Sequence, residues 1–140
     1  MYKLKFTVIS AIIFGISLFF PCFYTNDSIN GAAALFWGFM GMVAGGSNLC
    51  WLANPLLFGS WITSYFNNLM SFLFSIFAFI ISYSFYFATE IAVDEAGTPR
   101  EITRLGIAYW LWLLSIFVML ISTSVKLYQN YSKAKMLPNN

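Results

Sequence analysis

The stretch from Gly31 to Asn68, which contains no charged residue, constrains the fold of this chain more than any other feature. An α-helix rises about 1.5 Å per residue and needs about 20 residues to cross a hydrocarbon core of about 30 Å. The stretch is therefore too long for one membrane crossing and barely long enough for two. We expect an element other than a plain pair of membrane helices here.

The run Gly45-Gly46-Ser47-Asn48 divides this stretch. Glycine is costly inside helices, whereas Ser and Asn favour helix N-caps. We therefore expect a short re-entrant or interfacial helix over 32–44 and a membrane span over 49–66. The alternative is a single strongly tilted or kinked helix with frayed ends.

Small residues follow one face of the expected short helix. They are Ala34, Gly38, Gly41 and Gly45, at spacings of 4, 3 and 4. A face of this kind lets another helix approach closely. The pattern predicts a surface for helix packing or for a partner protein.

The composition places the whole chain in a membrane. Of its 140 residues, 60% are hydrophobic and 9% are charged, whereas a soluble domain has about 25% charged residues. Further apolar runs predict spans over 4–23, 69–88 and 102–127. We expect an all-α integral membrane protein, a single membrane domain over 1–140 with four transmembrane helices plus the short helix. Every charged residue lies outside the long apolar runs, at most near the end of a predicted span, which argues against an intramembrane proton relay.

The first apolar run also resembles a secretory signal peptide, with Lys3 and Lys5 before it. A signal peptide ends in a small-x-small cleavage site. Pro21-Cys22 follows the run instead. We therefore expect a retained first span.

Basic residues predict the orientation of the chain, because acidic residues contribute little to it. Four crossings put both termini on one side of a bacterial cytoplasmic (inner) membrane, together with a cytoplasmic tail over 128–140. That side then carries five lysines: Lys3, Lys5, Lys126, Lys133 and Lys135. The polar outer loop over 89–104 carries only Arg100 and Arg104. Its acidic residues, Glu90, Asp94, Glu95 and Glu101, fit a solvated loop better than a metal site or a catalytic pair.

The third predicted span has a weakly polar stripe at helical spacing. The stripe consists of Ser71, Ser75, Ser82 and Tyr86, with Ala78 on the same face. Such a stripe serves either to pack helices through small residues and hydroxyls or to line a solute path. Helix packing is the more common use.

The residue types present exclude most catalytic chemistry. The chain has no histidine and only two cysteines, so it lacks the commonest general base, a His-activated nucleophile and a metal-binding cluster. Cys22 and Cys50 do not form the close pair that thiol-oxidising enzymes use. Both lie near the outer ends of predicted spans, where they either form a structural disulfide or remain two apolar thiols. We expect no enzyme and no cofactor.

A proline interrupts the second predicted span. Pro55 lacks a backbone N–H, so it would leave the carbonyl of Trp51 without a helical partner. A membrane helix requires a replacement partner for that carbonyl, and Asn54 is the adjacent polar side chain. The three residues predict a kink, with Asn54 either stapling it or forming a small binding site, as broken helices do in transporters.

The run Trp51-Leu52-Ala53-Asn54-Pro55-Leu56 carries a resemblance. Together with the short glycine-rich segment before it and the entry Gly106-x-x-Tyr109 to the last span, it resembles a group of small, mostly uncharacterised bacterial membrane proteins with four spans. Members of that group carry basic residues after the second span, where this chain has Asn67-Asn68. The resemblance implies the four-span layout and no particular activity.

Two functions are compatible with these features. In the first, the protein binds another membrane protein, as an accessory subunit or an immunity-type protein. In the second, it is part of an oligomeric solute or ion channel or transporter. We expect the lipid bilayer and either another membrane protein or further copies of this chain as partners, and no nucleic acid.

Overall fold

The computed structural model describes residues 2–92 and 98–136, and most of them are helical. The five α-helices are α1 Tyr2–Ser17, α2 Gly31–Gly41, α3 Ala53–Thr63, α4 Asn68–Ser84 and α5 Ile107–Met136. Three 3₁₀ segments are η1 Met42–Ala44, η2 Gly46–Leu52 and η3 Phe85–Phe87. Five short strands are β1 Pro21–Tyr24, β2 Ser28–Asn30, β3 Glu90–Ala92, β4 Pro99–Glu101 and β5 Arg104–Leu105.

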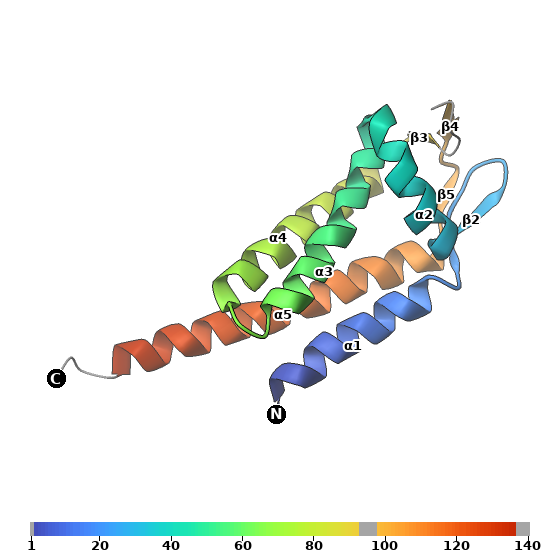
Figure 1. Ribbon diagram of the computed structural model, residues 1–140. Helices are drawn as coiled ribbons and strands as arrows, with labels where there is room; N and C mark the ends of the chain where they lie inside the picture. Colours follow the sequence, from blue (N-terminus) through green and yellow to red (C-terminus); the bar gives the residue numbers. More distant parts are fainter. Residues whose placement is uncertain (1, 93–97, 137–140) are drawn as a thin grey trace.

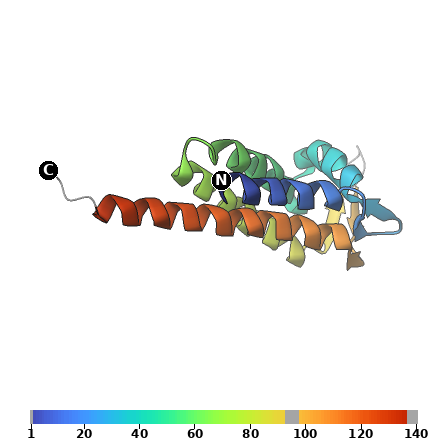
Figure 2. The ribbon, with the colours of Figure 1, turned by 90° about the horizontal axis from the view of Figure 1, so that it is seen from below.

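Four helices run along the long axis of the molecule, and α2 lies at one end of it (Figure 1). Helix α5 packs against α1 and α4, and α4 packs against α3. Figure 2 shows α1 and α5 side by side. The start of α1, the end of α5 and the α3–α4 turn lie at one end, which we call the terminal end. The strands and α2 lie at the opposite end, the strand end.

Two of the described helical segments are long and apolar enough to cross a membrane. They are Asn68–Phe87 and Ile107–Lys135. A third candidate is the pair Gly31–Gly41 and Gly46–Thr63, which is bent by 112° and is either a broken span or a re-entrant loop. Length and composition thus support two crossings, or three if the bent pair counts as one. They do not support the four expected from the sequence.

The predicted first span, 4–23, is wrong in its second part. Helix α1 ends at Ser17 and the chain continues into β1. Pro21 cannot donate a backbone hydrogen bond and disfavours helical geometry at the residue before it. Strand β1 pairs antiparallel with both β2 and β5. The expectation of an all-α protein is therefore corrected to a mostly helical one with two small sheets.

The boundaries of the last predicted span, 102–127, also differ. Helix α5 begins at Ile107, because β4 and β5 occupy the segment before it and pair with β3 and β1. The helix continues to Met136, so the predicted tail over 128–140 is helical as far as the structure describes it. The predicted loop over 89–104 contains strands, and its residues 93–97, including Asp94 and Glu95, lie outside the described residues.

The expected break between the short helix and the following segment lies at two glycines. Gly45 has φ 71° and Gly46 has φ 58°, values that side chains with a Cβ rarely adopt. Helix α2 and η1 together cover the predicted 32–44 segment. Asn30 is the N-cap of α2, because its Oδ1 accepts a hydrogen bond from the backbone N–H of Ala33 at 2.8 Å.

Two apolar clusters form the core. The first lies between the long helices and consists of Phe14, Ala53, Leu57, Ala78, Ile116 and Met119. The second lies at the strand end and consists of Phe23, Phe85, Ile91 and Tyr109. Large apolar side chains are exposed on every long helix, which is expected where a bundle faces lipid.

Candidate functional site

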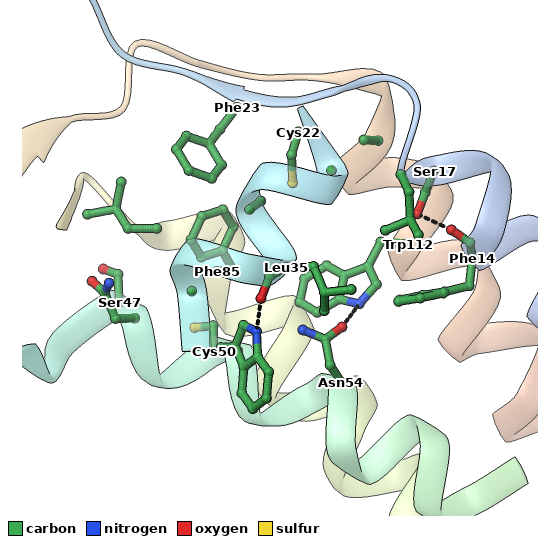
Figure 3. A pocket seen from close by; sticks show the side chains of 18 residues that line it. Phe14, Ser17, Cys22, Phe23, Leu35, Ser47, Cys50, Asn54, Phe85 and Trp112 are labelled. Carbon is green, nitrogen blue, oxygen red and sulfur yellow. Dashed lines mark hydrogen bonds between the residues drawn. The ribbon is translucent and has the colours of Figure 1, made fainter. Parts of the chain in front are cut away.

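A cavity of about 70 Å³ lies at the strand end, between the two core clusters (Figure 3). Residues from α1, β1, α2, η2, α3, η3, β3 and α5 line it. A water molecule needs about 10–15 Å³ of such volume. The cavity is therefore large enough for a ligand group of several atoms, and we call it the strand-end pocket.

Asn54 is one of the polar side chains that line this pocket and is only 6% exposed. Its Oδ1 accepts a hydrogen bond from Trp112 Nε1 at 2.9 Å. Because an indole nitrogen can only donate, the atom facing Trp112 must be the oxygen. The amide nitrogen Nδ2 then points away from Trp112, toward the space lined by Leu35 and Cys50 (Figure 3).

Pro55, where the sequence predicts a kink, lies just after the point where the 3₁₀ segment η2 passes directly into α3. Pro55 is the third residue of α3, and η2 precedes that helix. The backbone N–H of Ala53, two residues before the proline, bonds to the carbonyls of Cys50 and Trp51, so the Trp51 carbonyl has a backbone partner. Trp51 serves another purpose, because its Nε1 donates to the carbonyl of Leu35 at 2.6 Å and ties η2 to α2.

The small-residue face of α2 is covered by the chain itself. A Cβ atom at Gly38 would collide with the indole of Trp51, and one at Gly41 would collide with the side-chain amide of Asn48. Ala34 lines the strand-end pocket, and Gly45 lies at the bend. Gly38 and Gly41 therefore pack within the protein, whereas a Cβ at Gly45 would meet nothing within 4 Å.

Asn48 is a structural residue that the sequence reasoning missed. Its Nδ2 donates to the carbonyl of Ala92 at 2.9 Å, and its Oδ1 accepts from the N–H of Ala92 at 3.1 Å. The side chain thus pairs with β3 as a neighbouring strand would. Asn48 stood in the sequence only as a helix-capping residue, and no pattern linked it to a residue 44 positions away.

Cys22 and Cys50 both line the strand-end pocket, but they are free thiols and not joined by a disulfide bond. Burial raises the pKa of the Cys22 thiol to about 12, so it stays protonated at neutral pH. The sulfur of Cys50 lies 3.4 Å from the hydroxyl oxygen of Ser84. Within residues 2–92 and 98–136, no group of His, Cys, Asp and Glu is arranged to hold a metal ion.

The serines of the predicted polar stripe are buried between helices. Ser71 donates to the carbonyl of Ser60 at 2.8 Å, and the hydroxyl oxygens of Ser75 and Thr123 lie 2.8 Å apart. Ser82 donates within α4 to the carbonyl of Phe79 at 3.0 Å. These hydroxyls take part in helix packing.

Tyr86 lies outside this packing. Its side chain is exposed and stacks with Tyr83, with a ring-centroid distance of 6.3 Å. It also contacts Trp110, with the ring centroids 6.0 Å apart. Tyr86 therefore belongs to an exposed aromatic group rather than to the serine stripe.

No family model, no curated protein and no solved structure matches this chain. The resemblance carried by the run from Trp51 to Leu56 therefore stays a prediction.

Proposed function

We propose that the protein is a small, non-enzymatic integral membrane protein that acts by binding another membrane protein, as an accessory subunit or an immunity-type protein. The observation that carries this proposal is an apolar surface on α2 and η1. It consists of Phe36, Trp37, Phe39, Met40 and Val43, all of them exposed. Contiguous apolar surfaces of this kind mark interaction sites on proteins.

The position of this surface favours a protein partner. Helix α2 has 11 residues, too few to cross a bilayer. Backbone hydrogen bonds from Gly31 to Phe20 and from Ala32 to Leu18 tie its first turn to the end of α1. The surface is thus held in a fixed place beside the strand end, as a pre-formed docking surface requires.

The proposal includes the orientation expected from the sequence, with α1, the η2–α3 segment, α4 and α5 all crossing a bacterial inner membrane. Three lysines, Lys126, Lys133 and Lys135, lie on the second half of α5, and Arg100 and Arg104 lie at the strand end. The excess of basic residues at the terminal end supports a cytoplasmic location for both termini. Reporter fusions after residue 66 and at the C-terminus should both report a cytoplasmic location.

Purification from the native membrane in mild detergent, followed by mass spectrometry, tests the partner. We expect a larger membrane protein to copurify in a fixed ratio. The double variant Phe36→Ala/Met40→Ala should reduce its recovery about tenfold or more, because a few buried apolar residues dominate such interfaces. The control Phe77→Ala/Ile80→Ala removes equally exposed side chains from α4 and should leave recovery unchanged.

Two results would overturn the proposal. The protein could emerge alone as a defined oligomer, or both double variants could reduce recovery equally. The alternative function, an oligomeric channel or transporter component, gains no support from the serine stripe, because Ser71 and Ser75 are buried in helix contacts.

A further inference from the structure

We propose that the strand-end pocket binds the acyl-ester portion of a membrane glycerolipid, with the ester carbonyl accepting a hydrogen bond from Asn54 Nδ2. This site is separate from the α2 surface proposed to bind a protein. The inference rests on one unsatisfied donor, on the lining of the pocket and on its depth in the bundle.

The donor is the first part of the argument. Trp112 fixes which way the Asn54 amide is turned, and among the described residues Nδ2 has no hydrogen-bond partner. Nδ2 is not one of the fully buried side-chain atoms that lack a partner, so it is open to the space of the pocket and can donate to an occupant there. The pocket therefore favours an occupant that brings an acceptor to Nδ2.

The lining excludes a charged occupant. Phenylalanine, leucine, tryptophan and small residues make up most of the wall, and none of the described residues that line it is Asp, Glu, Lys or Arg. A phosphate or carboxylate would lose its hydration there and find no opposite charge on these residues, which disfavours its binding. The acceptor must therefore be neutral and carried by an apolar group. An ester carbonyl flanked by methylene groups meets both requirements.

The depth of the pocket points to a lipid as the source of that ester. One wall includes Phe14 of the apolar core between the helices, and the opposite wall includes Phe23 and Ile91 of the strand end. In a bilayer, ester carbonyls lie between the hydrocarbon and the headgroups. The pocket occupies the equivalent level of the proposed membrane orientation.

The pocket is also open to the membrane. The lining residues Leu35, Cys50 and Trp51 are only partly buried, so the pocket reaches the surface near α2 and η2. Leu49 and Leu52, next to them in η2, are exposed apolar side chains. A lipid chain can therefore approach over an apolar surface, and its headgroup can remain outside.

Two phosphatidylcholines with identical chains provide the test, one ester-linked and one ether-linked. Only the ester-linked lipid has carbonyl oxygens that can accept a hydrogen bond from Asn54. The full chain, ¹⁵N-labelled at asparagine, is placed in nanodiscs of each lipid and the Asn54 side-chain amide is followed by NMR. We expect a downfield shift of one Asn54 amide proton in the ester lipid alone. Native mass spectrometry of the detergent-purified protein should show a three- to tenfold preference for the ester lipid, the ratio that one hydrogen bond provides.

The variant Asn54→Leu keeps the branched shape and the number of non-hydrogen atoms of the side chain, removes the N–H donor, and should abolish the preference. Ser47→Ala changes another residue that lines the pocket and should retain it. The comparison of the two lipids needs no variant, so the test stands even if Asn54→Leu fails to fold. Equal Asn54 shifts in both lipids, as water alone in the pocket would give, overturn the proposal. Tighter binding of a free fatty acid than of the ester lipid overturns it as well.

Discussion

The two ends of the helix bundle are held together by different chemistry. Toward the terminal end, small hydroxyl side chains connect neighbouring helices, as in the pairs Ser60–Ser71 and Ser75–Thr123. At the strand end, longer amide and indole side chains connect segments that are distant in the sequence, as Asn48 does with Ala92. Short side chains bring helices close and leave little space, whereas long ones span gaps and leave a pocket.

Substitution of a tightly packed glycine at the strand end should lower the free energy of unfolding more than the other changes below. At Gly41 a methyl group would meet Asn48, which is held by its bonds to Ala92. We expect Gly41→Ala to lower the free energy of unfolding by about 3 kcal/mol, as overpacking does. Gly15→Ala is the matched control, because a Cβ there meets nothing within 4 Å. Helix propensity should make that variant up to about 1 kcal/mol more stable. Unfolding in mixed detergent micelles measures both, and equal effects would contradict the packing of α2 on η2.

Asn48→Leu should have the next largest effect, about 2 kcal/mol, because it leaves both the N–H and the carbonyl of Ala92 without their partner. Hydrogen exchange at the amide of Ala92 should become faster than in the native protein. The control Asn130→Leu changes an exposed asparagine on α5. If the exchange rate of Ala92 stays unchanged in the first variant, Asn48 does not hold β3.

Trp51→Phe removes the donor to the carbonyl of Leu35 and keeps the aromatic ring. We expect a loss of about 1 kcal/mol, a typical value for one hydrogen bond. Trp37→Phe changes a residue on the exposed side of α2 and should lower the stability by less than Trp51→Phe does. Thermal unfolding of the two variants under the same conditions tests the difference, and a larger loss for Trp37→Phe would be inconsistent with the structure.

The smallest expected effect on stability comes from the hydroxyl contacts toward the terminal end. A double-mutant cycle with Ser75→Ala and Thr123→Val should give a coupling energy of about 0.6 kcal/mol, the average for hydrogen bonds between membrane helices. The contact between the two hydroxyls would be disproved by a coupling energy of zero. A coupling energy larger than the stability loss measured for Trp51→Phe would remove the contrast between the two ends.

Features with a local period were predictable from the sequence. The serines of α4 recur at helical spacing and do face neighbouring helices, and the double glycine at 45–46 does end the short helix segment. The strands were not predictable, because an apolar run such as Cys22 to Tyr24 looks the same by periodicity whether it continues a helix or pairs as a strand, and Pro21 indicates only where the helix stops.

The candidate site was predictable in part. Asn54 stood out as a polar residue in an apolar run, but its bond to Trp112 joins residues 58 positions apart. No local pattern reports such a separation. The pocket itself arises from segments that meet only in the folded chain, so its lining could not be read from any one of them.

The 3₁₀ winding of η2 has a consequence for length. A 3₁₀-helix rises about 2.0 Å per residue, so the 7 residues of η2 extend about 14 Å, compared with about 10.5 Å for an α-helix. The 11 residues of α3 add about 16.5 Å. Together they reach about 30 Å, the thickness of the hydrocarbon core. In the proposed membrane orientation, the tighter winding thus compensates for the residues that the glycine bend diverts into α2, and it lets the shortened segment reach across a bilayer of ordinary thickness.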